Sequence, residues 1–540
     1  MKRNHTNIPS TYYGLVFIIV LLSMACSKVD HSIINQRYTK VLISKRFYKN
    51  PYSDLTLKVV FKGPENKLIN GYGYWDGSDT FKIRCFFPEK GEWTWNTICS
   101  DSLNKGLHNQ TGTVIVDNYT GNNKLYKEGY LKISDNKRYL AYGSGKPFLW
   151  LGETAWAAIS NATDQEWKRY VDDRVAQGFT VFQVYCASDW GGHHNIINQK
   201  PFLNDSLMEW NPYYWRTFED RIEYANSKGL VVLIVGIMEP VYDKPQQNVA
   251  KLFSRALVAR MMGNYVIFSP SFDDKYVPLA DSIGNLIKKL TNIHLVTQHP
   301  ATDLTANLLY CSKSYVDFGG LQSGAGWVSR IPHHKPINID TASKNAVVWS
   351  LRLRNSIKDK PFINLESRYD SELNQEQLPR LPRSCGYWTI LSGAIGYTYG
   401  CAGLWNWGLE KIKDPQASNW TYKRAINTPS AKQMTLLSVF FNKIEWWQLK
   451  PDTTIVISQP DLWHNRIVAA TTDNHTIVLY IPNSKSTNIN CPIDQTYHTL
   501  DWFNPLTGEN ISTNIGVMKE NRLEIVKPSG WDDALVVIKH

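Results

Sequence analysis

The sequence predicts a multidomain protein in which a central (β/α)₈ TIM barrel lies between N-terminal and C-terminal antiparallel β-sandwich domains. Three observations support this fold class. Short alternating strands separated by turn residues occupy both ends of the 540-residue chain. Between these ends, apolar stretches alternate with helical periods. One of the apolar stretches, Pro361 to Leu365, stops on Glu366, and a barrel presents its functional groups at the C-terminal ends of its strands.

Residues 1–25 have the pattern of a bacterial lipoprotein signal peptide. A charged start precedes an apolar run, Tyr12 to Leu22, that is too short to span a bilayer, and the sequence SMAC follows. Cys26 stands where a lipid-modified cysteine would stand. We therefore expect secretion across the inner membrane of a bacterium and a periplasmic or outer-membrane, cell-surface location, with a membrane contacted only through a lipid anchor at Cys26.

The net charge of +11 is scattered along the chain, which argues against a nucleic-acid partner and suits an acidic polysaccharide. Apart from Cys26 there are seven cysteines and no C-x-x-C spacing, so mostly free, buried thiols are expected rather than a zinc cluster. The pairs His193-His194 and His333-His334 do not place two nitrogens on one helical face. No metal and no cofactor are predicted, and the oligomeric state stays open.

Residues 30–120 are predicted to form the N-terminal β-sandwich, with strands at LTLKVVF, TFKIRCFF, EWTWNTI and GTVIVD. Trp93 and Trp95 alternate with polar residues in one of these strands. Such alternation favours core positions over a glycan-binding surface.

Residues 121–442 are predicted to form the barrel. Strands are expected at PFLWLG, FTVFQVYCA, GLVVLIVGIM, YVIFSP, HLVTQH, VDFGGLQ, PFINLE and IGYTYG, with helices at TDQEWKRYVDDRVAQG, YYWRTFEDRIEYANSKG and TASKNAVVWSLRLRNSIKD. A doubly wound open sheet is the alternative, but no G-x-G-x-x-G follows the first strand. Residues 443–540 alternate again, as in TTIVISQ, HTIVLYIP and ALVVIK, and predict the C-terminal sandwich.

The motifs FLWLGETAW, GFTVFQVY, LVTQHPAT, DFGGLQSG, PFINLES and GYWTILSGAIGYTYGCAGLW occur in this order, and over residues 130 to 442 the chain resembles the apiosidase-like glycoside hydrolases, family 140. The run GYWDGSDTFKIRCFFPEKGEWTW resembles a small β-sandwich module that precedes catalytic barrels in bacterial polysaccharide-degrading enzymes. The C-terminal segments IEWWQLKPD, TLDWFNPLTGE and GWDDALVVIK resemble a module named for collagen binding, for which packing against the barrel is an equally suitable role.

The resemblance implies two catalytic carboxyl groups, as glycosidic bond cleavage requires. It places the nucleophile at Glu366. In the family this Glu stands in a G-E-P context, whereas here Ser367 and Arg368 follow it. The resemblance places the general acid/base at Asp273, with Asp274 as the rival. In the family two glycines precede this Asp, whereas Ser271 and Phe272 stand here, which leaves open a capping role or a lost site.

Further residues are candidates for binding substrate, each set against a structural or core role. Carboxylates and amides can hold sugar hydroxyls, and aromatic rings can stack on a sugar face. The candidates are Glu153, Trp156, Tyr185, Glu239, Asp274, His299, Gln322, Tyr369, Tyr399 and Trp405.

The resulting hypothesis is a glycoside hydrolase that cleaves a bond in a plant or algal polysaccharide, with retention if the two carboxyl groups lie about 5 Å apart. One alternative is a non-catalytic, glycan-binding surface lipoprotein on a degenerate barrel. A peptidase ranks last, because the chain has no H-E-x-x-H and no G-x-S-x-G.

Overall fold

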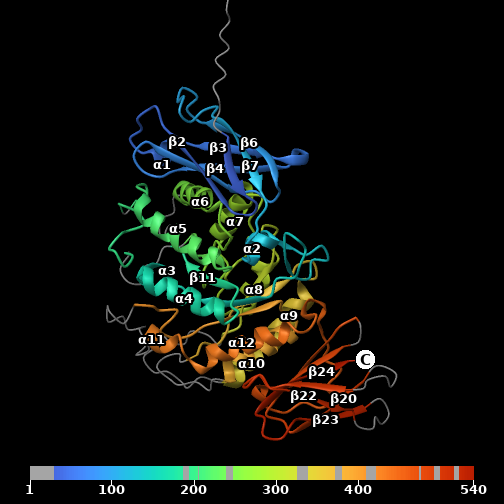
Figure 1. Cartoon of the computed structure of the whole chain (residues 1–540). Helices are drawn as coiled ribbons and strands as arrows, with labels where there is room; N and C mark the ends of the chain where they lie inside the picture. The colour runs from blue at the N-terminus through green and yellow to red at the C-terminus, as the bar shows by residue number, and fades with distance from the viewer. Residues whose placement is uncertain are drawn as a thin grey trace, which may run out of the picture.

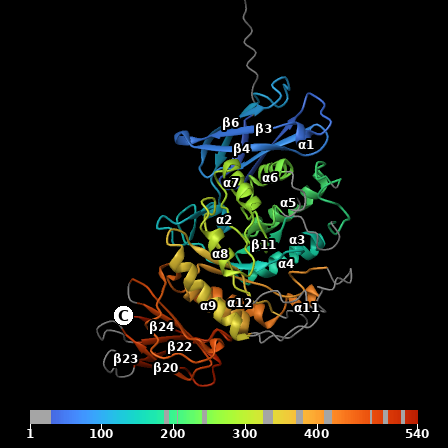
Figure 2. The same cartoon turned by 180° about the vertical axis from the view of Figure 1, so that it is seen from behind.

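The computed structural model of the chain describes residues 29–186, 194–204, 206–238, 247–324, 339–370, 380–408, 421–473, 476–491, 499–515 and 522–539. Three parts follow one another from top to bottom in Figure 1: a β-rich N-terminal part, a central part of strands and helices, and a β-rich C-terminal part. Figure 2 shows the same stacking from behind. The N-terminal part contacts helices α6 and α7, whereas the C-terminal part contacts α9 and α10.

The N-terminal part is a seven-stranded sheet with the order β1-β7-β6-β3-β4-β5-β2. The ends of this sheet meet, because the Tyr38 hydroxyl in β2 donates to Asp30 in β1 at 2.6 Å. Trp93 and Trp95 are 0% and 3% exposed, which confirms the predicted core positions. The elements are β1 (Asp30–Ile33), β2 (Arg37–Ile43), α1 (Pro51–Asp54), β3 (Leu57–Lys62), η1 (Pro64–Asn66), β4 (Leu68–Trp75), β5 (Thr80–Phe86), β6 (Gly91–Cys99), β7 (Thr111–Asp117) and α2 (Lys124–Glu128), followed by the hairpin β8 (Leu131–Ile133) and β9 (Leu140–Tyr142).

The central sheet is parallel and has the order β13-β12-β11-β10-β16-β15-β14. All residues of these strands are buried, as expected when helices cover a parallel sheet. The strands are β10 (Trp150–Thr154), β11 (Val181–Tyr185), β12 (Val231–Val235), β13 (Val266–Phe268), β14 (Gly319–Gln322), β15 (Phe362–Glu366) and β16 (Gly396–Tyr399). The helices are α3 (Ala158–Asn161), α4 (Asp164–Ala176), α5 (Pro212–Ser227), α6 (Gln247–Met261), α7 (Pro278–Leu290), α8 (Leu304–Cys311), α9 (Ile339–Ser356), α10 (Arg380–Leu391), α11 (Tyr422–Ala425) and α12 (Pro429–Phe441).

The two edge strands, β13 and β14, are joined by the extended segment 295–300. The Thr297 amide donates to the Phe268 carbonyl at 2.9 Å on the β13 side. On the β14 side, the Asp317 amide donates to the Val296 carbonyl at 2.8 Å. The sheet therefore closes into a ring that resembles a TIM barrel.

The expectation of eight regular strands in the barrel is corrected. In the central part, the described residues form seven parallel strands, and the strand predicted at HLVTQH is an irregular segment joined by isolated bridges. Side chains take hydrogen-bonding positions that a regular ladder gives to the backbone. The Asp317 carboxylate accepts from the Val296 amide at 2.7 Å, and the Thr297 hydroxyl donates to the Phe318 carbonyl at 2.8 Å. Pro300 offers no amide N–H to extend the ladder.

The C-terminal part consists of a six-stranded sheet, β17-β18-β19-β24-β21-β22, and a two-stranded sheet, β20-β23. Arg383 of α10 anchors it to the central part, because its guanidinium contacts the fully buried Asp533 at 2.7 Å. The elements are η5 (Trp446–Gln448), β17 (Lys450–Pro451), η6 (Trp463–Asn465), β18 (Val468–Thr471), β19 (Ile477–Pro482), β20 (Ser486–Asn490), β21 (Thr499–Phe503), β22 (Asn510–Asn514), β23 (Arg522–Val526) and β24 (Asp533–Lys539).

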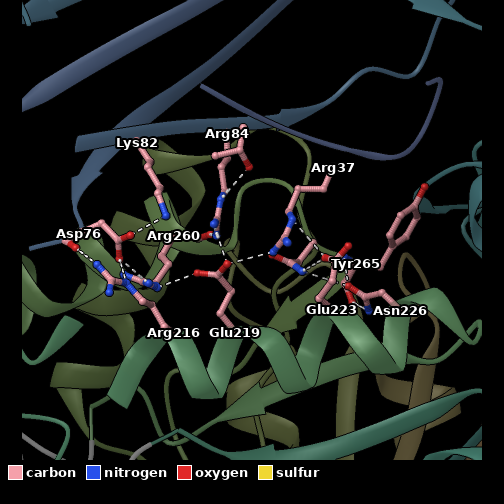
Figure 3. Close-up of polar contacts among 12 residues, drawn as sticks. Arg37, Asp76, Lys82, Arg84, Arg216, Glu219, Glu223, Asn226, Arg260 and Tyr265 are labelled. Carbon is pink, nitrogen blue, oxygen red and sulfur yellow. Dashed lines mark hydrogen bonds and ion pairs between the residues drawn. The ribbon is translucent and has the colours of Figure 1, made fainter. Parts of the chain in front are cut away.

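A buried cluster of charges joins the N-terminal part to helices α5 and α6 (Figure 3). Glu219 of α5 receives guanidinium groups from both sides: Arg84 of β5 at 2.6 Å and Arg260 of α6 at 2.8 Å. Arg260 also contacts Asp76, which follows β4, at 2.7 Å. Burial acts to raise the pKa of Glu219, but the arginines outweigh it and lower that pKa. The N-terminal part is thus fixed to the ring by ionised side chains.

The seven cysteines from Cys85 to Cys491 are free and buried, as predicted. Among the described residues, no helix is both long and apolar enough to cross a membrane.

Candidate active site

Predicted site residues meet at the C-terminal end of the ring. Glu366 is the last residue of β15, and Gln322 is the last residue of β14. Asp273 follows β13, and His299 lies in the closing segment 295–300. Because the strands are parallel, these positions share one edge of the sheet.

The imidazole of His299 lies beside both carboxyl groups. Its Nε2 is 3.3 Å from Oε2 of Glu366, and its Nδ1 is 3.7 Å from Oδ1 of Asp273. One oxygen of each carboxyl group and one ring nitrogen lie within 4.8 Å of one another. The Gln322 amide nitrogen donates to Oδ1 of Asp273 at 2.8 Å. The fold therefore brings the two predicted catalytic carboxyl groups face to face.

His299 is an uncharged ring. Its side chain is fully buried, and burial lowers its pKa to about 3. Neither ring nitrogen makes a hydrogen bond to any part of the chain that the structure describes. At neutral pH the ring has one N–H donor and one lone-pair acceptor to offer to the two carboxyl groups.

Aromatic rings form one wall of the site. Phe272 packs edge-on against Trp156 and Tyr185, with centroid distances of 4.8 and 5.2 Å, and its ring centroid is 5.2 Å from that of His299. The Trp156 indole donates to the Tyr369 hydroxyl at 2.9 Å. Phe272 thus fills the space beside the acid with an apolar group.

The loop that carries Asp273 is tied to the closing segment. Asp274 forms a parallel bridge with Pro300 through its backbone. The Gln298 amide oxygen accepts from the Ser271 amide at 3.1 Å and from the Ser271 hydroxyl at 2.5 Å. Our sequence analysis did not single out Gln298. The sequence feature that could have indicated it is a polar residue inside the apolar stretch HLVTQH.

Glu153 lies away from the site. Its two carboxylate oxygens accept from the Arg174 guanidinium at 2.6 and 3.0 Å, and the Tyr170 hydroxyl adds a bond of 2.7 Å. The side chain is fully buried, so the structure favours the structural role over sugar binding. Tyr399 is also held within the fold, because its hydroxyl contacts Asp370 and Thr428 at 3.1 and 3.0 Å.

The remaining aromatic candidates line the site as buried rings. Trp156, Tyr185, Tyr369 and Trp405 are between 1% and 5% exposed, and the rings of Tyr369 and Trp405 lie 6.3 Å apart. Their flat faces are covered by the protein in this structure. Glu239 and Cys26 lie outside the described residues, as do three of the paired histidines, His193, His333 and His334.

The trio Asp273, His299 and Glu366 is the group of described side chains close enough together to hold a metal ion. Zinc in proteins holds its ligands about 2.0–2.2 Å from one point. Two catalytic acids beside a histidine have the same spacing, so these distances do not by themselves assign a metal.

A TIM-barrel-like ring with two carboxyl groups near one another at its C-terminal end is an arrangement that glycoside hydrolases use. Residues 134–448 match the profile of the family described as "Apiosidase-like, catalytic domain". The match covers more than half of the chain, so this protein belongs to the apiosidase-like family and is a glycosidase. The alternative of a non-catalytic barrel is not favoured by this membership.

The flanking parts also match known domains. Residues 36–100 match "Domain of unknown function (DUF5060)", and residues 450–538 match "Putative collagen-binding domain of a collagenase". Among curated proteins, none matches this chain.

Solved structures share the fold. A family 5 glycoside hydrolase from Bacteroides vulgatus ATCC 8482 has 21% identity and a TM-score of 0.65, covering 77% of this chain and 94% of that one. A protein described as a "putative glycoside hydrolase" from the same organism has 14% identity and a TM-score of 0.70, covering 95% of this chain and 100% of that one. A further glycoside hydrolase has 21% identity and a TM-score of 0.64, covering 78% of this chain and 98% of that one.

Proposed function

We propose that this protein is a retaining glycoside hydrolase in which Glu366 is the nucleophile and Asp273 is the general acid/base. The observation that carries the proposal is that one oxygen of each carboxyl group lies within 4.8 Å of the other, beside His299. Retaining enzymes hold these groups about 5–5.5 Å apart, whereas inverting enzymes leave about 6.5–9.5 Å for a water molecule.

The reaction then has two steps. Glu366 attacks the anomeric carbon while Asp273 gives its proton to the departing glycosidic oxygen, which leaves a glycosyl ester on Glu366. Water next attacks the same carbon, Asp273 takes its proton, and the ester bond breaks to restore the Glu366 carboxylate. Asp273 is suited to meet the leaving group and the water because its side chain is 33% exposed, against 7% for Glu366.

His299 is an uncharged ring beside both acids, with its Nε2 3.3 Å from Glu366 and its Nδ1 3.7 Å from Asp273. The Gln322 amide donates to Oδ1 of Asp273 at 2.8 Å. We assign His299 and Gln322 to positioning the two carboxyl groups.

We propose that the ring is a (β/α)₈ barrel in which the segment 295–300 is the fifth strand. We further propose that residues 30–120 and 443–540 are separate sandwich domains, that the chain is exported and tethered through Cys26, and that its substrate is a plant or algal polysaccharide. The scattered positive charge supports an acidic substrate.

The proposal is tested with Glu366→Gln and Asp273→Asn on a panel of plant and algal polysaccharides, with Asp274→Asn as the matched control. Each of the first two variants should lower kcat/KM by about 100-fold or more, and the control should keep most of the activity. NMR of the first product should show a retained anomeric configuration. An inverted product, or loss of activity in Asp274→Asn with an active Asp273→Asn, would overturn the assignment.

A further inference from the structure

Two neighbouring loops of the N-terminal part expose apolar side chains. The loop 44–50, which follows β2, carries Phe47, and the loop 100–106, which follows β6, carries Leu103. Phe47 is 92% exposed and Leu103 is 65% exposed. Most large apolar side chains of this part are buried, so two such exposed tips on adjoining loops suggest a contact surface.

The two loops are locked together by Asn104. Its amide oxygen accepts from the Lys45 amide at 3.1 Å, and its amide nitrogen donates to the hydroxyls of Ser44 and Tyr48 at 2.8 and 3.0 Å. Gly106 is required here, because a Cβ at this position would lie 1.9 Å from the Ile43 carbonyl oxygen. The fold thus holds the apolar tips in fixed positions.

Positive charge surrounds these tips. Lys45, Lys49 and Lys105 are exposed, and none of them forms an ion pair within the described residues. Asp101 of the second loop is paired with Arg46 at 3.0 Å. The surface with apolar tips and a lysine rim is called the loop platform below: residues 44–49 and 101–105.

The chain enters the N-terminal part at the same end as the loop platform. β1 runs parallel to β7, with Asp30 opposite Val114, and β7 begins at Thr111, soon after the loop 100–106. Cys26 lies four residues before Asp30, a distance that a chain spans in at most about 14 Å. A lipid at Cys26 would therefore hold the loop platform close to the bilayer.

We propose that the loop platform contacts an anionic phospholipid surface, with Phe47 and Leu103 entering the interface and the lysines facing the head groups. Apolar tips with lysines on the same loops are the pattern of interfacial membrane contacts. A glycan is a poorer fit, because sugars stack on flat aromatic faces and Leu103 offers none. The proposal is independent of the glycosidase assignment.

The first test detects membrane contact at one position, residue 47. In the full chain with Cys26→Ser, the described cysteines are buried, so Phe47→Cys can be labelled selectively with an environment-sensitive fluorophore. Val526→Cys, at a 60% exposed position of β23 in the C-terminal part, is the matched control. With vesicles of phosphatidylglycerol and phosphatidylcholine, the label at position 47 should shift to the blue and the control label should not. No shift at position 47, or equal shifts at both positions, would overturn the proposal.

The second test measures binding to the same vesicles by sedimentation. The double variant Phe47→Ser/Leu103→Ser should weaken binding by about tenfold or more, and Lys45→Gln/Lys49→Gln/Lys105→Gln should remove most of its salt sensitivity. Sugar release from a soluble substrate should stay unchanged in both. A shift at position 47 caused by soluble oligosaccharides, or self-association abolished by the double variant, would assign the platform to a glycan or to a second copy instead.

Discussion

Glu219→Gln should lower the free energy of unfolding more than a conservative substitution at the surface, because it weakens the contact between the N-terminal part and the ring. The substitution keeps the side-chain volume and removes one charge from the cluster in Figure 3. Arg84, Arg260 and Arg37 contact this carboxylate at 2.6, 2.8 and 3.0 Å, and Arg84 and Arg260 are 3% and 0% exposed. Breaking a buried ion pair by removing one partner costs about 3–5 kcal/mol, because the remaining charge stays buried without compensation.

The free energy of unfolding should be measured by urea denaturation at neutral pH, beside Asp173→Asn as the control. Asp173 pairs with Arg169 at 3.8 Å on the surface of α4, with both side chains well exposed, so its loss should cost about 0.5 kcal/mol or less. A Glu219→Gln protein within about 1 kcal/mol of the wild type would refute the ionic account of this interface.

The destabilisation caused by Glu219→Gln should also depend on pH. The folded pKa of Glu219 is lowered, so the proton binds the unfolded chain more readily than the folded one. The stabilisation is complete above the usual glutamate pKa of about 4.3 and is lost as the pH falls through the lower folded value. The difference between wild type and Glu219→Gln should therefore shrink between pH 5 and pH 3, and a constant difference would contradict the reasoning.

Two further predictions concern the site and the thiols. His299→Leu should lower kcat/KM by about tenfold or more, because the ring that contacts Glu366 and Asp273 no longer positions the two carboxyl groups. His299→Gln should keep more of the activity, and an unchanged kcat/KM in His299→Leu would count against this positioning role. The seven described cysteines should not react with a thiol reagent at pH 8 until the protein unfolds. Burial excludes the reagent and raises the pKa of Cys311 to about 12. Rapid reaction of the native protein would show that the core opens.

Much of the fold was predictable from local pattern. The strand that ends on Glu366 and the other strands of the ring are short continuous apolar runs, and the helices that follow several of them repeat every 3.6 residues. A window of a few residues contains either signal. Alternation with polar residues placed Trp93 and Trp95 in the core. The segment 295–300 was the exception, since part of its pairing runs through the side chains of Thr297 and Asp317, and no local window includes both.

The sequence by itself determined the order of strands and helices, the family and the pair of acids worth testing. The tertiary structure decided which polar residues face one another: Glu153 is held by Arg174 within the fold, whereas His299 stands beside Asp273 and Glu366. The physical reason is that periodicity is a property of neighbours along the chain. The partner of a buried charge is selected by chain closure, which brings together residues from separate strands and helices.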